Sequence, residues 1–307
     1  MKNIILDLIQ VSEETAIAAS KLVGKNDQIA ADAAAVNSMR AGFNKIDFKG
    51  KVIIGEGERD EAPMLFIGEV VGASKGDVKY DIAVDPLECT TRCAKGDGGS
   101  MVAMVVAEKG HLLAAPDVYM KKIASACHEV DLDASVEENL IAVSTSQGVD
   151  ISNITVAVLD RDRHSELVNE ILSAGAKIKL ISDGDIAVAI MACMAGSGVD
   201  IYMGIGGAPE GVIAAAAISM LGGKMESKLL FKNESERKRA ASMIDCDIDS
   251  KFSQEEMSRN GELAFIISGI TPGELLSGAD NCMIDTICIY RNSTGNILNR
   301  RILTNRC

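Results

Sequence analysis

Short apolar runs alternate with helical patterns through the second half of the chain, and this alternation constrains the fold more than any other feature. Three runs rich in Ile, Val and Leu predict strands, and the segments after them carry the spacing of helices. Such an alternation is typical of α/β domains built around a largely parallel sheet. The predicted elements are strand 154–159, helix 165–174, strand 177–181, helix 186–194, strand 199–203 and helix 209–221.

The length of the chain allows more than one domain. It has 307 residues, of which 47% are hydrophobic, so it can bury a large core in one or two domains. Upstream of the alternating region, the predicted order is two helices followed by strands. We therefore predict an N-terminal α+β domain over residues 1–150 and a C-terminal α/β domain over residues 151–307.

The charge of the chain excludes several classes of partner. The net charge of −13 repels nucleic acid and anionic membranes, so we expect neither as a partner. An anionic small molecule would need metal ions or a few local arginines. No signal peptide or membrane span is evident and the eight cysteines show no CxxC pair, which together predict a cytoplasmic protein with reduced thiols.

The segment Asp85-Pro-Leu-Glu-Cys-Thr90 places two carboxylates and a hydroxyl directly after the predicted strand 82–84. Pro86 has no backbone N–H, so we expect the strand to end there and Asp85 to stand at its carboxyl end, where α/β active sites commonly lie. Carboxylates suit Mg²⁺ or Mn²⁺, and Thr90 is close enough to orient a water or contact a phosphate. A turn with solvated acids is the alternative.

Asp32 interrupts an apolar stripe. Residues 27–43 read as a helix whose stripe is formed by Ile29, Asp32, Val36 and Met39, at spacings of three and four. Asp32 is therefore expected on the buried face. A buried carboxylate costs several kcal/mol unless it is paired or bound to a metal, so a ligand role or a cation from elsewhere would resolve the cost.

Glu56 lies on a Gly-rich turn after the predicted strand 51–54. The flanking Gly55 and Gly57 allow the backbone to approach a ligand closely. An acidic side chain on such a turn suits a metal, whereas an ordinary acidic loop is the alternative.

A second glycine-rich segment, Gly204-Ile-Gly-Gly207, is predicted to form a tight loop before an Ala-rich helix that has Pro209 in its first turn. Backbone N–H groups at a helix start attract anions, and glycines let a phosphate approach. Glu210, in the first helical turn, could reach a metal. The spacing matches neither a Rossmann fingerprint nor a Walker loop.

Two charged pairs follow two of the predicted parallel strands. Arg161 and Arg163 can grip a phosphate bidentately, although a solvated loop is an equal alternative. Asp183 and Asp185 can accept hydrogen bonds from sugar hydroxyls, and helix N-capping by Asp185 is the competing explanation.

Taken in order, these stretches resemble the bacterial class II fructose-1,6-bisphosphatase family from about residue 10 to about residue 290. The matching segments are Ala31-Asp-Ala-Ala-Ala-Val-Asn37, Ile54-Gly-Glu-Gly-Glu58, Asp60-Glu-Ala-Pro-Met64, Asp81-Ile-Ala-Val-Asp-Pro86 with Glu88 and Thr90, Ala115-Pro-Asp117, Tyr119-Met120, Asp183-Gly-Asp185, Gly204-Ile-Gly-Gly-Ala-Pro-Glu-Gly211 and Ser268-Gly-Ile-Thr271. The resemblance implies a layered α/β/α/β/α sugar-phosphatase fold with the active site between the two halves. It also implies that the first domain binds metal and the second binds sugar phosphate.

The resemblance implies roles for individual residues. A two-metal site with Mn²⁺ or Mg²⁺ would be held by Asp32, Glu56, Asp85, Glu88 and Glu210. The catalytic residues would be Thr90, which helps to position the attacking water, with Glu56 and Asp85. Substrate contacts would come from Glu88, Cys89, Thr90, Tyr119, Arg161, Asp162, Arg163, Asp183, Gly184, Asp185 and Gly207.

The activity implied is metal-dependent removal of the 1-phosphate of fructose 1,6-bisphosphate, serving gluconeogenesis, by a homo-oligomer that is a dimer or a tetramer. Sedoheptulose 1,7-bisphosphate, one carbon longer, would use the same clamp and is an alternative or second substrate. Cys89 departs from the family, which usually has Gly there. If that position needs positive φ, Cys costs about 1–2 kcal/mol. A non-catalytic sugar-phosphate-binding protein is therefore a further alternative.

Overall fold

The computed structural model describes residues 1–55, 65–280 and 283–305, and the chain divides into two compact units. Unit 1 comprises Met1–Leu112 and Asn260–Cys307, and unit 2 comprises Leu113–Arg259. Unit 2 is thus a continuous segment inserted into unit 1. Both units combine helices with a sheet, which confirms the predicted α/β class.

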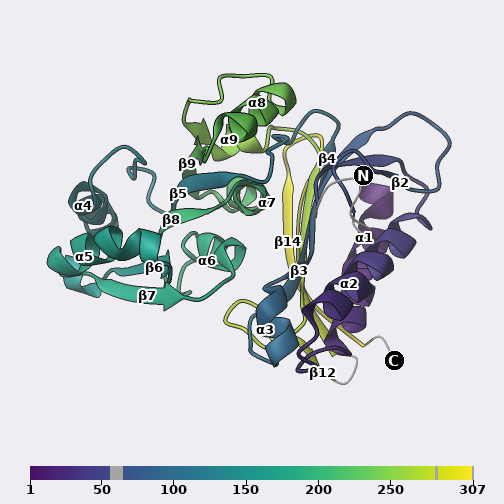
Figure 1. Cartoon of the computed structure of the whole chain (residues 1–307), viewed down its shortest axis with the longest axis horizontal. Coiled ribbons are helices and arrows are strands. Elements are labelled where there is room, and N and C mark those ends of the chain that lie inside the picture. Colours follow the sequence, from purple (N-terminus) through teal and green to yellow (C-terminus); the bar gives the residue numbers. More distant parts are fainter. Residues whose placement is uncertain (56–64, 281–282, 306–307) are drawn as a thin grey trace. The chain divides into compact units, whose positions relative to one another are not determined.

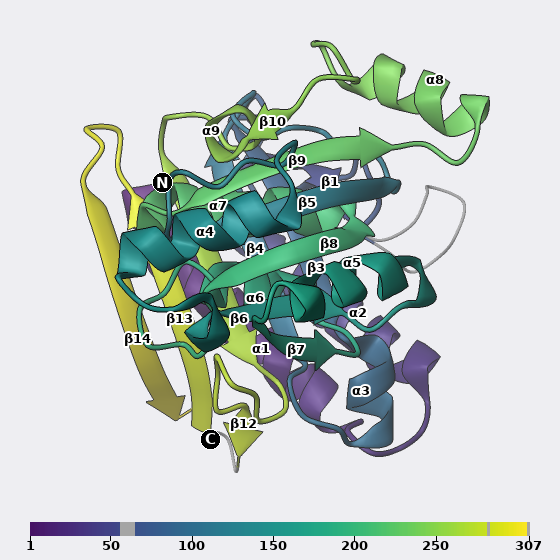
Figure 2. The same cartoon turned by 90° about the vertical axis from the view of Figure 1, so that its left-hand side faces the viewer.

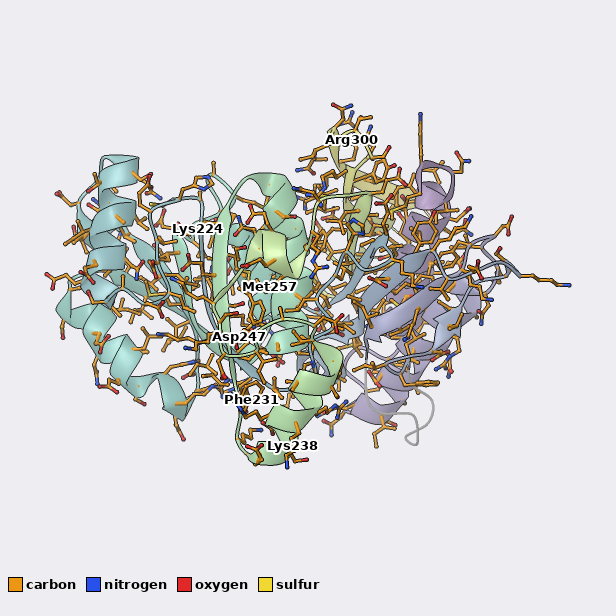
Figure 3. All side chains as sticks on the ribbon, turned by 90° about the horizontal axis from the view of Figure 1, so that it is seen from above. Lys224, Phe231, Lys238, Asp247, Met257 and Arg300 are labelled. Carbon is orange, nitrogen blue, oxygen red and sulfur yellow. The ribbon has the colours of Figure 1, made fainter. Side chains whose placement is uncertain are left out.

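Unit 1 is built on a mixed sheet of eight described strands, in the order β12-β13-β11-β4-β3-β1-β2, with β14 paired to β13. The central strand β11 is buried along its whole length because it pairs with β4 and β13 on its two sides. The edge strand β14 is mostly exposed, as the Arg300 side chain illustrates (Figure 3). The strands are β1 (Gly50–Ile54), β2 (Val70–Val71), β3 (Tyr80–Glu88), β4 (Met101–Glu108), β11 (Leu263–Gly269), β12 (Ala279–Asp280), β13 (Met283–Arg291) and β14 (Ile297–Asn305).

Helices α1 (Ile5–Ser20) and α2 (Gln28–Phe43) cover one face of this sheet (Figure 1). The helix predicted over residues 27–43 is confirmed, and Asp27 caps it by accepting a hydrogen bond from Ala30 N at 2.9 Å. Helix α1 also reaches the last strand, where the fully buried Glu13 accepts a hydrogen bond from Thr304 at 2.7 Å. A short helix, α3 (Thr90–Lys95), follows β3.

Unit 2 has a six-stranded sheet in the order β10-β9-β5-β8-β6-β7. Strands β6, β7 and β8 run parallel, whereas β5 runs antiparallel to both β8 and β9. The strands are β5 (Tyr119–Ser125), β6 (Thr155–Leu159), β7 (Lys177–Ile181), β8 (Ile201–Gly207), β9 (Lys224–Leu230) and β10 (Phe252–Ser253).

Helices cover both faces of the unit 2 sheet. Figure 2 shows α4 and α5 in front of the strands, and α6 and α7 lie on the opposite face (Figure 1). The helices are α4 (Val136–Gln147), α5 (Ser165–Ser173), α6 (Asp185–Met191), α7 (Ala208–Leu221), α8 (Glu234–Met243) and α9 (Gln254–Met257), and a 3₁₀ turn spans Asp162–His164. The predicted alternation of strands and helices is confirmed element by element. Among the described residues, no helix is long and apolar enough to cross a membrane.

The predicted domain boundary at residue 150 falls inside unit 2. Strand β5 lies before that boundary but pairs with β8 and β9, which lie after it. Likewise β11 and β13, far beyond residue 150, complete the unit 1 sheet beside β4. Strand pairing, rather than position along the chain, sets the division.

Candidate functional site

In unit 1 the predicted site residues Asp85 to Thr90 lie at an irregular end of β3, which we call the β3 turn. The strand was predicted to end at Pro86, but it continues to Glu88 through a bulge between Asp85 and Glu88 opposite β4. A bulge tolerates a proline because the ladder is already interrupted there. Asp85 Oδ1 accepts a hydrogen bond from Leu87 N at 3.0 Å, which fixes the bend.

Cys89 holds the left-handed conformation, with φ 66° and ψ 48°. This confirms that the position needs the backbone geometry that glycine adopts most easily. The thiol is buried, and Ser100 Oγ donates a hydrogen bond to the Cys89 carbonyl at 3.2 Å. The reversal lets Thr90 begin α3, with its hydroxyl donating to Leu87 O at 2.9 Å.

Asp32 is half-buried rather than on the buried face, so the predicted stripe is wrong at Ile29 and Asp32, whereas Val36 and Met39 are buried as predicted. Ile29, the first member of that stripe, lies in the first turn of α2 and is 84% exposed. The buried residues of α2 are Ala31, Ala35, Val36, Met39, Gly42 and Phe43. Asp32 lies beside these buried residues and is only half-buried, so its burial alone does not require a metal.

The predicted metal ligands are only partly described. Glu56 falls within residues 56–64, outside the described residues, and Glu210 belongs to unit 2. Over residues 1–55, 65–280 and 283–305, no three or more His, Cys, Asp or Glu side chains gather as a metal centre. Asp85 and the buried Glu88 supply carboxylate oxygens, so the donor chemistry of the β3 turn fits Mg²⁺ or Mn²⁺. The full ligand set stays a prediction.

In unit 2 the predicted sugar-phosphate residues meet at one edge of the sheet, which we call the strand-end edge. It is formed by the carboxyl ends of β6, β7 and β8 and by the start of β5. Asp160 N donates to Ile181 O at 2.7 Å, and Tyr119 pairs with Gly207 across β5 and β8. The structure therefore brings together Tyr119, Arg161, Asp162, Arg163, Asp183, Gly184, Asp185 and Gly207.

Cations surround Tyr119 on this edge. The Arg163 guanidinium carbon lies 4.8 Å from the Tyr119 ring centroid, and Lys232 Nζ lies 4.4 Å from it. Arg163 also donates from Nε and Nη2 to Ile205 O, at 3.1 and 2.7 Å, which uses part of the donor fork predicted to grip a phosphate. Lys232 was not predicted, because nothing in the sequence relates it to a tyrosine 113 residues earlier.

His164 anchors the same loop from inside. Its Nε2 accepts a hydrogen bond from Ile205 N at 2.8 Å, so Nδ1 carries the proton that is donated to Leu159 O at 2.7 Å. Burial, helped by the nearby Arg163 and Arg161, lowers the pKa of His164. The neutral imidazole therefore has a structural role, linking β6 to β8.

The predicted loop Gly204–Gly207 is a strand, because β8 continues through it in register with β5. Its glycines make room for side chains. A Cβ on Gly204 would lie 3.2 Å from the His164 ring, and one on Gly207 would lie 1.9 Å from Glu210 Oε2. Helix α7 then starts at Ala208, with Pro209 in its first turn as predicted.

Asp185 is the first residue of α6, and the N-cap position is occupied by Gly184 in the left-handed conformation. The alternative that Asp185 caps the helix is therefore wrong. Its carboxylate instead contacts Lys122 Nζ at 2.5 Å and the Tyr202 hydroxyl at 3.2 Å. Neither Lys122 nor Tyr202 was predicted as a site residue: Tyr202 lies on the predicted strand 199–203, and residues 119–125, which carry Lys122, were not predicted as a strand.

Known proteins are similar to this chain over most of its length. Positions 2–297 match the family described as "Bacterial fructose-1,6-bisphosphatase, glpX-encoded". A "D-fructose 1,6-bisphosphatase class 2/sedoheptulose 1,7-bisphosphatase" of Trichodesmium erythraeum is 43% identical over 305 residues, covering 91% of this chain and 88% of that protein. A protein of the same description from Synechocystis is 43% identical over 299 residues, covering 89% and 87%.

Among solved structures, an inositol monophosphatase from Anabaena aligns with a TM-score of 0.40 and 12% identity, over 79% of this chain and 96% of that one. The family match spans nearly all of the chain, and the relatives are similar over most of both lengths. The chain belongs to the bacterial, glpX-encoded fructose-1,6-bisphosphatase family.

Proposed function

We propose that this protein hydrolyses the 1-phosphate of fructose 1,6-bisphosphate, releasing fructose 6-phosphate and phosphate, with Mg²⁺ or Mn²⁺ as cofactor. Family membership supports the reaction. The observation that carries the proposal is the β3 turn, where a bulge and a left-handed residue bend the six-residue segment that carries Asp85, Glu88 and Thr90.

Thr90 is suited to orienting a water. A hydroxyl has one donor and two acceptor sites, and the Thr90 donor is already used by Leu87 O at 2.9 Å. Toward a water, Thr90 Oγ1 therefore acts as an acceptor, and the water's lone pairs are free to face a phosphorus atom. Holding the attacking group in one orientation is a large part of phosphoryl-transfer catalysis.

Asp85 and Glu88, with Asp32, Glu56 and Glu210 by resemblance, are the residues that we propose as ligands of the cation. When bound, a divalent ion supplies charge neutralisation for the phosphoryl group and makes a bound water more acidic. Because Asp85 Oδ1 is oriented by Leu87 N, this carboxylate is held in place before any ligand arrives.

The strand-end edge supports recognition of the distal phosphate and the sugar. Arg163 and Lys232 gather positive charge around Tyr119 on a chain whose net charge is −13, and Arg161 follows the end of β6 beside them in sequence. Local cations of this kind give an anionic substrate a place to bind. Both Asp185 contacts use Oδ2, and we assign Oδ1 to a sugar hydroxyl.

Phosphate release by the full-length protein tests the proposal, with Mn²⁺ or Mg²⁺ and an EDTA control. We expect turnover of fructose 1,6-bisphosphate that EDTA abolishes. Thr90→Ala should lower kcat by about 10²-fold, Thr90→Ser should retain activity, and Thr91→Ala, next in the chain and exposed, should match wild type. Absence of turnover with either metal would refute the proposal and favour a sugar-phosphate-binding protein.

Sedoheptulose 1,7-bisphosphate belongs in the same assay, because the relatives are named for both substrates. The homo-oligomer implied by the resemblance stays a prediction, which light scattering on the purified protein tests.

A further inference from the structure

Lys122 is a buried cation at the strand-end edge. It lies on β5 and its side chain is 2% exposed. Its ammonium lies 2.5 Å from Asp185 Oδ2 and donates to Gly207 O at 2.9 Å. Removing an ammonium from water costs several kcal/mol unless it is paired and hydrogen-bonded, and these two contacts meet that need.

The two partners of Lys122 come from different connections. Asp185 follows β7 and begins α6, whereas Gly207 ends β8 and precedes α7. One ammonium therefore ties together two segments that both belong to the predicted substrate-binding set. The buried Tyr202 hydroxyl adds a second donor to Asp185 Oδ2, at 3.2 Å. Burial and the neighbouring Asp185 raise the pKa of Tyr202 well above its usual value, which keeps this donor protonated.

The glycines around Lys122 clear the space that this arrangement occupies. A Cβ on Gly206 would lie 2.1 Å from Asp185 Oδ2 and 2.9 Å from Lys122 Nζ. A Cβ on Gly211 would lie 3.2 Å from Lys122 Cδ. The nearest atom to that Cβ would be Met120 Sδ, at 2.6 Å, so Met120 and Lys122 together account for a glycine at 211, which inside a helix such as α7 costs about 1 kcal/mol relative to alanine.

We propose that Lys122 is a positioning residue that sets the separation of Asp185 from Gly207 and cancels the Asp185 charge where an anionic sugar phosphate binds. This inference rests on the proposed function and deepens it. Without the ammonium, Asp185 would present an uncompensated carboxylate to a substrate of the same sign, and the Gly207 carbonyl would lose its donor.

The test compares Lys122→Met with Lys121→Met in the full-length protein. Lys121 is the adjacent lysine, exposed, with its ammonium on Leu132 O, so it controls for loss of charge on β5. We expect Lys122→Met to raise KM for fructose 1,6-bisphosphate about tenfold while kcat changes less than about threefold. In Asp185→Asn protein, adding Lys122→Met should change KM much less, because the charge to be compensated is gone.

Hydrogen exchange in the absence of substrate gives a second readout. Lys122→Met should raise amide exchange over residues 182–186 and 205–208, whereas Lys121→Met should not. Unchanged exchange together with an unchanged KM would overturn the proposal. If Lys122→Met does not fold, Tyr202→Phe removes one contact of the same carboxylate and should raise KM about threefold; an unchanged value would count equally against it.

The two proposals fail in different ways. If wild-type protein releases no phosphate, the proposed function is wrong, and the exchange data alone decide whether Lys122 positions the two segments. If wild type is active and Lys122→Met keeps its KM and exchange pattern, the positioning role is wrong and the proposed function stands.

Discussion

The β3 turn and the strand-end edge hold their residues in different ways. In the β3 turn the local backbone conformation fixes the side chains, through a bulge, a left-handed residue and short-range hydrogen bonds to the backbone of Leu87. At the strand-end edge, charged side chains from distant parts of the chain hold one another, and glycines provide the space. The first arrangement depends on conformation at single positions, whereas the second depends on pairs. A substitution should therefore have a different signature in each.

The largest effect should come from breaking the Lys122–Asp185 pair. Asp185→Ala leaves a buried ammonium without its counter-charge, and breaking such a pair from one side costs about 3–5 kcal/mol. We expect the free energy of unfolding, measured by urea titration, to fall by that amount. Adding Lys122→Met should recover much of the loss.

The exposed Arg237–Asp249 pair is the matched control. It is also an ion pair within unit 2, but both side chains are largely exposed. Asp249→Ala should therefore change stability little, since water replaces the lost partner. Equal losses for Asp185→Ala and Asp249→Ala would show that burial does not distinguish the two pairs.

A smaller effect on stability should distinguish glycine from alanine substitutions at Cys89 and Cys93, two cysteines in or next to the β3 turn. Cys89→Gly and Cys89→Ala both remove a buried thiol, but only glycine relieves the left-handed backbone, so Cys89→Gly should be more stable by about 1 kcal/mol. Cys93, four residues on, is buried within α3, where alanine is the better helix former. There the order should reverse, with Cys93→Ala more stable by about 1 kcal/mol. The same order at both positions would contradict a backbone-held turn.

The smallest effect should be a loss of stability in mild acid from His164. Because burial lowers the folded-state pKa of His164, the unfolded chain takes up a proton first as the pH falls below about 6.5. This contribution is absent above that pH and grows below it, and linkage limits it to less than about 1 kcal/mol at pH 6. Protonation of His164 at Nε2 would also point its N–H group at the backbone N–H of Ile205, and the hydrogen bond between them would be lost.

Thermal unfolding between pH 7.5 and 5.5 measures this effect. His164→Gln should show a flatter dependence of Tm on pH than wild type, while His111 and His128 remain in both proteins. An equal slope would assign the acid sensitivity to other groups.

Local patterns predicted the alternating strands and helices over residues 154–221 of unit 2, whereas β5, α4 and β9 of the same unit were not predicted. Strands β6 and β7 and helices α5, α6 and α7 follow from apolar runs and helical spacing alone. Residues 204–207 read as a loop because the side chains that require glycine at 204 and 206, His164 and Asp185, lie far away in sequence. Strand β5 was not predicted, and residues 119–125 were assigned to the first domain, because the strands that pair with β5 follow it by 76 residues or more.

The candidate site shows the same limit. The possibility of positive φ at Cys89 came from the resemblance, because the family usually has Gly there, and the left-handed conformation of Cys89 bears it out. The burial of Asp32 was mispredicted because the buried face of α2 includes the small residues Ala31, Ala35 and Gly42, which hydrophobic spacing alone does not single out. Lys122 and Lys232 became visible only once the strands that carry or precede them were paired.

The insertion of unit 2 within unit 1 has a consequence for protein synthesis. A chain emerging from the ribosome completes unit 2 at residue 259, before β11 and β13 exist. Until then β4, an almost wholly buried strand, lacks the neighbour with which it pairs over residues 263–269. Domains generally fold as units during synthesis, usually starting from the N-terminus. Here the unit that begins the chain is the last to be finished, so its apolar strand must stay protected from aggregation while the ribosome translates nearly half the gene.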